Sequence, residues 1–409
     1  MKAVVFTLGC KVNECESNSL IEGLIKKGYT VSDRLERADL YIVNTCAVTS
    51  EAEKKSRQMV SRIKKLNPLA KIIFTGCASQ KNPDSFIKKD NNILVTGTFN
   101  KGQIIEMIQK SGCNIFEKSD TFEELLPAKS LRTRSFIKVQ DGCNNYCSYC
   151  IIPYLRGNSR SRNPESVLKE INNCKSKEIV ITGINLSAYD YKGQGLKELI
   201  DKLKDVDKRI RLGSLEVGVI TRELMQSLKA LKNFAPHFHL SLQSGADNVL
   251  KKMNRHYTTS EYLDKVRLIR EYFIDAGITT DIIVGFPSES EQDFNDTMSF
   301  VERAGFSDIH PFIFSPRSGT VAYKMKDIDP CIKKARLDEL IIKKQRLKSA
   351  FINAQQGKEV NVLIEEFKDG YSVGYSENYI RVYVKEKLAS GELKKVKIVG
   401  EYLDGALAK

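Results

Sequence analysis

The sequence contains no long apolar run. No segment approaches the roughly 18–20 consecutive apolar residues that a membrane-spanning helix needs, so we expect no membrane association. An export signal is also missing, because the apolar stretch Ala3–Leu8 is shorter than the roughly 7–15 residues of a signal-peptide core and polar residues follow it directly. These two absences predict a cytoplasmic protein.

Acidic residues are fewer than basic ones. The chain has 51 Asp and Glu against 65 Lys and Arg, which gives a net charge of +14. This excess favours an anionic partner such as nucleic acid, although a generally lysine-rich surface would give the same count. The 409 residues are too many for one hydrophobic core, which predicts two to four domains.

The ten cysteines are not expected to form disulfides, because the cytoplasm is reducing. Metal or redox chemistry is then the favoured interpretation. Cys143, Cys147 and Cys150 are separated by three and then two residues, and the next candidate ligands are as far away as Cys174 and His237. A structural zinc site needs four protein ligands, whereas three thiolates can hold a four-iron cluster and leave one iron open to an external chelating molecule. Cysteines that are simply buried are the alternative.

Short apolar runs alternate with helices in the N-terminal part, which predicts a parallel sheet in an α/β domain. The expected strands are Val4–Leu8, Leu40–Asn44, Lys71–Thr75 and Ile93–Val95, and the expected helices are Ser17–Lys27 and Ser50–Leu66.

Three further cysteines each follow the carboxyl end of one of these strands. They are Cys10, Cys46 and Cys77. Ligands bind at that edge of an open α/β sheet, and neighbouring strands bring their ends within about 5–10 Å of each other. We therefore predict a second metal site there, with independent buried thiols as the alternative. Cys15 is either an extra ligand or an inert thiol at the start of the next helix.

A strand followed by a helix recurs six times from about Phe136 onward, which predicts a partial barrel of βα units. The expected strands are Phe136–Val139, Glu178–Thr182, Arg209–Leu215, His237–Leu242, Thr279–Val284 and Asp308–Phe314. Sites in barrels lie at the carboxyl ends of the strands, where glycines let the backbone approach a ligand. The candidate cofactor-binding residues at these ends are Thr182, Gly183, Asn185, Glu216, Ser241, Gln243, Gly285 and Pro287, although each alone is typical of an ordinary turn.

Two segments are candidates for RNA contact. Arg156, Arg160 and Arg162 stand in a loop with Ser and Gly just after the three-cysteine motif, which is typical of phosphate contacts and also of a solvated loop. After a long charged helix near Cys331–Gln355, short strands predict a small β-barrel of a type that often binds nucleic acid. Tyr379 and Arg381 could bind RNA there, or pack within that barrel.

The chain resembles the radical S-adenosylmethionine (SAM) methylthiotransferases over nearly its full length. The matching segments are Thr7–Asn13, Asn44–Cys46, Gly76–Gln80, Cys143–Cys150, Ile151–Tyr154, Arg156–Arg162, Ser241–Gly245 and Ile283–Pro287. Leu8–Asn13 and Ile151–Tyr154 are most similar to the branch that acts on N6-threonylcarbamoyladenosine in tRNA. Cys15 and Ser288 depart from the family pattern, and the first leaves the number of N-terminal ligands open.

This resemblance implies an N-terminal methylthiotransferase domain (1–125), a radical SAM domain (126–352) and a TRAM-like RNA-binding domain (353–409). It implies two [4Fe-4S] clusters, one at Cys143, Cys147 and Cys150, which binds SAM, and one at the three N-terminal cysteines. SAM cleavage would give a 5′-deoxyadenosyl radical, and the second cluster would carry the sulfur.

The implied reaction is methylthiolation at carbon 2 of N6-threonylcarbamoyladenosine at tRNA position 37, beside the anticodon. The implied partners are tRNA, an electron donor (flavodoxin-like or similar) and a sulfur donor. Rival interpretations are an enzyme acting on isopentenyladenosine in tRNA or on an aspartate of a ribosomal protein, and a non-catalytic RNA-binding protein that contains metal.

Overall fold

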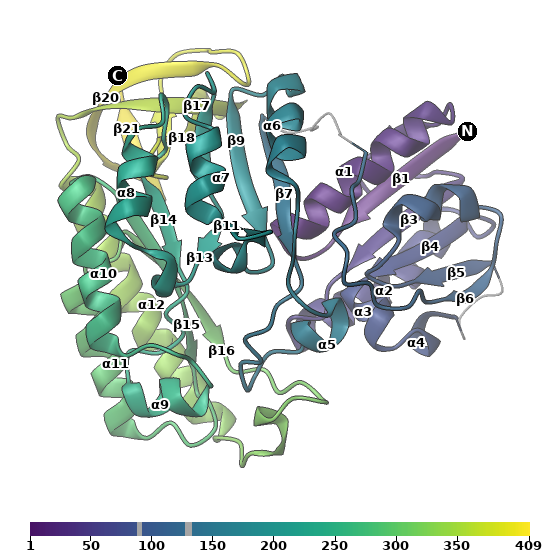
Figure 1. The fold of residues 1–409 in the computed structure, drawn as a ribbon, viewed down its shortest axis with the longest axis horizontal. Helices are drawn as coiled ribbons and strands as arrows, with labels where there is room; N and C mark the ends of the chain where they lie inside the picture. The colour runs from purple at the N-terminus through teal and green to yellow at the C-terminus, as the bar shows by residue number, and fades with distance from the viewer. Residues whose placement is uncertain (88–91, 127–132) are drawn as a thin grey trace.

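The computed structural model describes residues 1–87, 92–126 and 133–409. It contains a six-stranded sheet near the N-terminus, two four-stranded sheets that form a curved central layer, and a closed barrel near the C-terminus. In Figure 1 the N-terminal sheet lies beside the central layer, and the C-terminal barrel lies at one end of that layer. The predicted fold class is confirmed: α/β, with a partial barrel, a parallel-sheet domain and a small β-barrel.

All neighbouring strands of the N-terminal sheet run parallel, in the order β2-β1-β3-β4-β5-β6. Helices α1 (Lys11–Lys26) and α2 (Ser50–Leu66) cover opposite faces, because Leu24 of α1 and Ile63 of α2 belong to different apolar clusters. Burial on both faces explains the apolar runs in these strands. The strands are β1 (Lys2–Thr7), β2 (Thr30–Ser32), β3 (Leu40–Thr45), β4 (Lys71–Gly76), β5 (Ile93–Thr96) and β6 (Gly112–Asn114).

Helix α1 begins at Lys11, well before the predicted start at Ser17. Its first turns are polar, and Asn13 and Glu16 are nonetheless buried, at 1% and 0% exposure. These side chains face the central part of the molecule, so the usual apolar periodicity of a buried helix face is missing from this stretch of sequence.

The central strands run parallel in chain order. The third predicted strand is divided into β12 and β13 at Gly213. The strands are β7 (Arg134–Asp141), β9 (Glu178–Gly183), β12 (Arg209–Leu212), β13 (Ser214–Leu215), β14 (His237–Leu240), β15 (Gly277–Val284) and β16 (Asp308–Ile313). In the described part of the chain β7 and β16 do not pair, so the barrel is open along one side.

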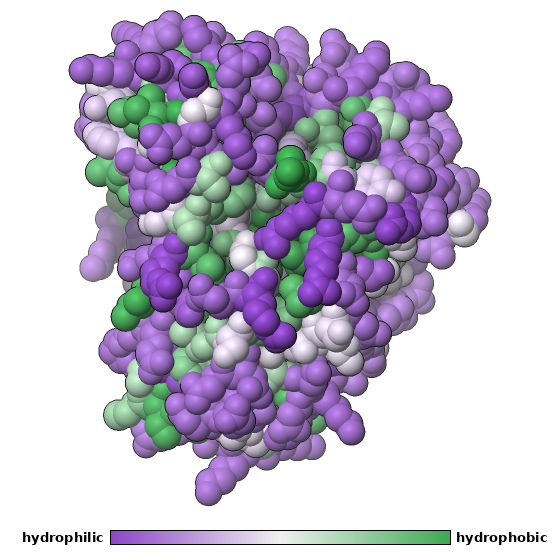
Figure 2. Space-filling model, turned by 90° about the vertical axis from the view of Figure 1, so that its left-hand side faces the viewer, coloured by the Kyte–Doolittle hydropathy of each residue, from purple (hydrophilic) through white to green (hydrophobic). Residues whose placement is uncertain are grey.

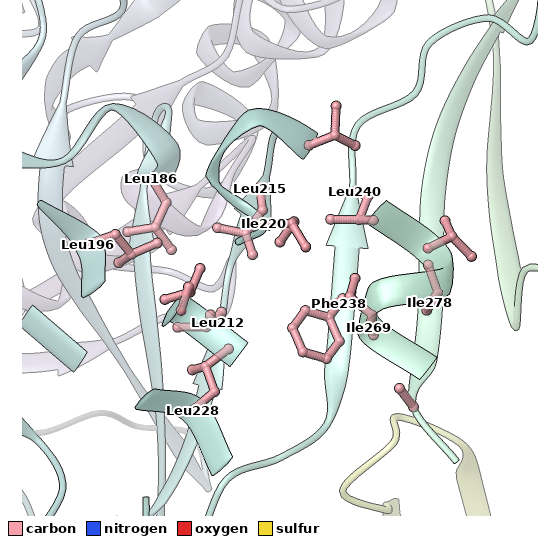
Figure 3. Packing of buried hydrophobic residues seen from close by; sticks show 14 of the residues in the cluster. Leu186, Leu196, Leu212, Leu215, Ile220, Leu228, Phe238, Leu240, Ile269 and Ile278 are labelled. Carbon is pink, nitrogen blue, oxygen red and sulfur yellow. The ribbon is translucent and has the colours of Figure 1, made fainter. Parts of the chain in front are cut away.

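Helices cover the outer face of this sheet, and apolar residues fill the layer between. Phe238 and Leu240 of β14 pack with Ile278 of β15 and Ile269 of α10 (Figure 3). Because successive strand residues point to opposite faces, the residues between them point into the barrel. The helices are α6 (Pro164–Asn173), α7 (Leu196–Lys202), α8 (Arg222–Lys229), α10 (Thr259–Tyr272), α11 (Glu291–Ala304) and α12 (Pro330–Asn353).

The N-terminal domain lies across the open side of the barrel. On one side α1 packs on β7, where Lys138 Nζ is 3.1 Å from Glu16 Oε1. On the other side the start of α2 meets the loop after β16, where Ser50 Oγ is 3.0 Å from Ser315 Oγ and accepts a hydrogen bond from Arg317 Nη1 at 3.0 Å. The domain therefore spans from β7, whose outer neighbour is the two-residue strand β8 (Arg160–Ser161), to the edge strand β16.

The C-terminal barrel closes in the order β17-β18-β19-β21-β20 and packs on the amino ends of the central strands. Arg209 Nη1 donates to the Asn361 carbonyl at 2.7 Å, and Arg211 Nη1 donates to the Glu377 carbonyl at 3.0 Å. The strands are β17 (Glu359–Lys368), β18 (Tyr371–Tyr375), β19 (Arg381–Val384), β20 (Leu393–Tyr402) and β21 (Gly405–Ala408). Among the described residues, no helix combines the length and apolar character needed to cross a membrane.

Candidate active site

The three-cysteine loop follows β7 and is fixed at both ends. Gly142 has φ +70°, and a Cβ atom there would lie 1.9 Å from the Asn158 carbonyl oxygen, so only glycine fits. The Cys143 amide donates to the Gly157 carbonyl at 3.1 Å, and the Ser148 amide donates to the Met253 carbonyl at 3.0 Å. This anchoring gives the loop a defined shape.

The three thiols of this loop lie near one another and face nitrogen donors. Arg255 Nη1 lies 3.3 Å from Cys147 Sγ, and Asn185 Nδ2 lies 3.8 Å from Cys143 Sγ. Burial, together with the neighbouring thiols, raises the pKa of the Cys150 thiol to about 12. Iron binds the thiolate form, so metal binding would have to displace these protons. Hydrogen-bond donors that point at the sulfur atoms, as these do, suit cysteines that bind metal as thiolates.

A cavity of about 1060 Å³ lies beside this loop. Its wall includes Asn185 and Glu216, which were among the predicted cofactor-binding residues, and also Asn145 and Arg255. Glu216 Oε1 is 2.7 Å from Asn145 Nδ2 and 2.7 Å from Arg255 Nη1. The cavity therefore offers carboxylate, amide and guanidinium groups, which suit the amino and carboxylate groups of an amino acid.

The outer part of this cavity reaches Arg222 of α8 and Arg267 of α10. Both helices lie on the left of Figure 1, which is the side that faces the viewer in Figure 2. Hydrophilic side chains dominate that face, and the most hydrophilic ones gather near its middle. The cavity thus opens toward a polar surface.

The other predicted cofactor-binding residues do not line this cavity: Thr182, Gly183, Ser241, Gln243, Gly285 and Pro287. The Ser241 carbonyl instead accepts hydrogen bonds from Tyr257 Oη at 2.8 Å and Arg255 Nη2 at 3.3 Å. Gly285 lies under α12, where an added Cβ would be 2.4 Å from Lys333 Cγ. Arg255 and Tyr257 were not predicted as site residues from the sequence, although the polar character of the segment that contains them could have indicated a site.

The N-terminal cysteines also come together. Cys10 precedes α1, Cys46 follows β3, and Cys77 begins the short helix α3 (Cys77–Lys81). A Cβ atom on Gly9, which has φ +106°, would lie 3.0 Å from Cys46 Sγ. Burial, together with the nearby Cys77 and Cys10 thiols, raises the pKa of Cys46 to about 12.

Neither triad forms a site for a single metal ion among the residues that the structure describes. A single ion requires ligand atoms at about 2.0–2.6 Å from one point, whereas a cluster of several irons spaces its cysteines further apart. The donor set of free thiols therefore fits a cluster better than a lone ion. Cys15 donates to the Phe136 carbonyl at 3.3 Å and so lies against β7.

A buried group of charges joins the two cysteine-bearing regions. Glu16 Oε1 is 2.8 Å from Arg156 Nη1, and Glu16 Oε2 is 3.0 Å from Lys101 Nζ. Asp141 is 2.7 Å from Lys138 and 3.0 Å from Arg156. Burial alone would raise the pKa of Glu16, but Arg156, Lys101 and Lys138 lower it well below its usual range. No local sequence pattern marks this group, because Glu16 and Lys101 are distant along the chain from the other members.

The position of the three arginines does not support the predicted RNA contact. Arg156 is 0% exposed, and Arg160 and Arg162 are 7% and 6% exposed. Arg160 pairs with Asp141 at 3.3 Å, and Arg162 pairs with Glu124 at 2.8 Å. These guanidinium groups hold carboxylates of the protein itself, so their charge is not free for phosphate.

The two predicted RNA-binding residues of the C-terminal barrel also have partners. The Tyr379 ring stacks on His237 at 4.5 Å between centroids, so it belongs to the contact between the barrels. Arg381 pairs with Asp404 at 2.8 Å and is only partly buried. The position of Tyr379 is therefore explained by packing, whereas Arg381 keeps solvent-accessible surface.

Residues 137–301 match the radical SAM superfamily, and residues 2–97 match a family described as "Uncharacterized protein family UPF0004". The chain is 35% identical to the "Threonylcarbamoyladenosine tRNA methylthiotransferase MtaB" of Bacillus subtilis, over 98% of this chain and 94% of that protein. The chain belongs to the radical SAM methylthiotransferase family. The Thermotoga maritima protein with the same description as the Bacillus one is 40% identical, over 93% of this chain and 91% of that protein.

A "tRNA-2-methylthio-N(6)-dimethylallyladenosine synthase" from Thermoanaerobacter sp. is 37% identical, over 88% of this chain and 81% of that protein. The solved radical SAM methyltransferase TsrM from Kitasatospora setae has a TM-score of 0.54 and 12% identity, over 76% of this chain and 74% of that one, and supports the fold alone. As a member of this family the chain is an enzyme, a methylthiotransferase, and SAM and a [4Fe-4S] cluster are its implied cofactors.

Proposed function

We propose that this enzyme methylthiolates carbon 2 of N6-threonylcarbamoyladenosine at position 37 of tRNA. The observation that carries the proposal is the pair of cysteine triads, Cys10 with Cys46 and Cys77, and Cys143 with Cys147 and Cys150, in a chain whose full-length relatives have that activity in their names. The net charge of +14 is consistent with an RNA substrate.

Each triad would hold one [4Fe-4S] cluster, so we expect two clusters per chain. Residues 1–125 would form the methylthiotransferase domain, 126–352 the radical SAM domain, and 353–409 a TRAM-like domain that contacts tRNA. When bound, the clusters and SAM supply the radical chemistry that carbon 2 of adenine requires, because this carbon offers no acidic proton or good leaving group.

The residues beside Cys143 would position SAM. Glu216 would accept hydrogen bonds from the amino group of its methionine part, and Arg255 would pair with the carboxylate. Asn185 directs its amide at Cys143 Sγ at 3.8 Å and lines the same cavity, so it would fix the ligand beside the cluster. Each of these groups is held in place before the ligand arrives, which lowers the entropic cost of binding.

The reaction also requires an electron donor, flavodoxin-like or similar, and a source of sulfur. Both are expected as separate partners of the enzyme.

Nucleoside mass spectrometry of tRNA from cells with and without this gene tests the proposal. We expect 2-methylthio-N6-threonylcarbamoyladenosine to disappear without the gene while its unmethylthiolated precursor accumulates. Loss of the methylthiolated isopentenyladenosine instead would assign the chain to the other tRNA branch, and an unchanged nucleoside profile would contradict an activity on tRNA.

A further inference from the structure

The inner face of the central barrel is polar between β14 and β16. His237 Nε2 and His239 Nδ1 lie 3.0 and 2.9 Å from Thr279 Oγ1, and His239 Nε2 lies 3.1 Å from Asp281 Oδ2. The ring of His310 on β16 is 5.5 Å from that of His239. Barrels are usually filled by branched apolar side chains at such positions. We call these five residues the polar wall.

The polar wall is open to solvent on the side of β16. His310 is exposed, and the Asp281 side chain is 28% exposed. Next along β16, Phe312 is 44% exposed. Thr279 and His310 also line a cavity of about 280 Å³. His237 Nδ1 is buried without a hydrogen-bond partner among the described residues. The wall thus combines a solvent-facing side with one unused hydrogen-bonding atom, His237 Nδ1, that a polar ligand could engage.

Lys11 supplies an unpaired positive charge close to the polar wall. It directly follows Cys10 and keeps solvent-accessible surface although protein atoms surround it, and Asp281, Arg211 and Arg134 are close enough to interact with its charge. It forms no hydrogen bond or ion pair with any residue in the described ranges. Lys11 is also the first residue of α1, where the helix dipole disfavours a cation.

The nearby arginines cannot take the place of Lys11. Arg211 Nε lies 2.9 Å from Glu178 Oε1, and Arg134 Nη2 lies 2.5 Å from Glu365 Oε1. Both guanidinium groups are thus already engaged by carboxylates of the protein, although Glu178 alone does not cancel the charge of the arginines around it. A cation beside two guanidinium groups and a helix N-terminus is unfavourable by itself, and an anionic ligand group would relieve it.

We propose that Lys11 determines substrate specificity by pairing with the carboxylate of the threonylcarbamoyl group, whose remaining polar atoms face the polar wall. This inference rests on the proposed function. An isopentenyl group has no charge and no hydrogen-bonding atoms, so it would leave both Lys11 and the polar wall without partners. The polar site would then reject it, because unpaired polar groups are costly to bury.

Binding of short RNA hairpins to the iron-loaded enzyme tests this inference. The hairpins carry the anticodon loop with position 37 as N6-threonylcarbamoyladenosine, as its carboxylate methyl ester, or as unmodified adenosine. We expect the wild type to bind the acid about tenfold or more tightly than the ester, since hydrogen bonds to charged groups are worth at least that factor. Lys11→Met should bind acid and ester equally, and Lys11→Arg should keep much of the preference.

The matched control is Lys54→Met, which removes the same charge from an exposed lysine of α2 and should leave the preference unchanged. Iron content should match the wild type in every variant. A preference for the acid that survives in Lys11→Met would overturn the inference, as would equal weakening of all three hairpins, which would place Lys11 against a backbone phosphate. A wild type without any preference for the modified base would instead count against the proposed function.

Discussion

The sulfur atoms of Cys143 and Cys147 each face a nitrogen donor from another part of the barrel. Asn185 comes from the loop after β9, and Arg255 comes from the segment before α10. Hydrogen bonds to ligand sulfurs tune the electronics of an iron–sulfur cluster. Arg255 also pairs with Glu216, so one guanidinium group connects the triad with the cavity wall.

Replacing Cys147 with Ala tests the role of the central triad. We expect SAM cleavage to be lost and the iron content to fall from about eight to about four per chain, because a [4Fe-4S] cluster is held by cysteine thiolates and the N-terminal triad is untouched. Iron analysis and detection of 5′-deoxyadenosine measure both effects. Cys331→Ala, at an exposed cysteine of α12, should change neither quantity. Cleavage that persists in Cys147→Ala would contradict the assignment.

Glu16 is the carboxylate on which the contact between α1 and the barrel depends. We expect Glu16→Gln to lower the free energy of unfolding by about 3–5 kcal/mol, because it leaves the buried Lys101 without a carboxylate and leaves Arg156 and Lys138 to share Asp141. Urea denaturation measures the change. Glu51→Gln removes a carboxylate whose side chain is 64% exposed and 3.8 Å from Lys55, and should cost less than about 1 kcal/mol. Equal effects of the two substitutions would refute the special role of Glu16.

The convergence of the cysteines could be predicted from the sequence, whereas the burial of the arginines could not, for one physical reason. Cysteine spacing and position after strands are local properties, so both triads could be predicted before their geometry was known. The burial of Arg156 depends on Glu16, which is 140 positions away in sequence. A basic loop is usually solvated, and the sequence does not reveal a distant carboxylate that will cover it.

At the scale of elements, most strands could be predicted, whereas the start of α1 could not. Apolar runs buried on two faces predicted β3 and β4 closely. Helix α1 begins with polar residues that are buried against β7, and this burial replaces the apolar pattern that normally marks a helix. The polar inner face of β14 and β15 could not be predicted either. Whether a strand residue points into the barrel or outward depends on how the barrel closes, and the local sequence does not show this.

Strand β9 begins with Glu178, which connects the central strands with the C-terminal barrel through three arginines. Burial would raise the pKa of Glu178, but Arg211, Arg209 and Arg134 hold it at about 2. The unfolded value is about 4.3. Because the folded pKa is depressed, this carboxylate stabilises the fold above about pH 4.3, and its contribution is lost as the pH falls toward 2.

Acid titration of stability tests this linkage. We expect the free energy of unfolding of the wild type to fall between about pH 4.3 and pH 2, with Glu178 contributing of order 3 kcal/mol. Glu178→Gln should have lower stability at pH 7 and a shallower decline over this window, as measured by urea denaturation at a series of pH values. Parallel curves for the two proteins would show that Glu178 does not contribute.

At the scale of the whole molecule, the two cysteine triads belong to different sheets that a single domain contact brings together. The N-terminal domain spans the open side of the barrel, from α1 on β7 to α2 beside the loop after β16. The buried charges of Glu16, Arg156 and Asp141 lie in that contact.

Replacing Cys46 with Ala separates the tasks of the two domains. We expect methylthiolation to stop while some 5′-deoxyadenosine is still formed, because the central triad is intact. Mass spectrometry of the RNA nucleosides and of the small-molecule products measures both. Cys113→Ala, at an exposed cysteine of β6, is the matched control and should behave as wild type. Continued methylthiolation in Cys46→Ala would show that the N-terminal cysteines are dispensable.

The strand edges of this fold leave little room for self-association. The C-terminal barrel is closed, so each of its strands has neighbours on both sides. The outer strands of the N-terminal sheet, β2 and β6, have only three residues each, and Pro311 removes one amide donor from β16. A foreign chain that tried to extend any of these sheets would find few unpaired backbone groups, so recognition of partners has to use side chains.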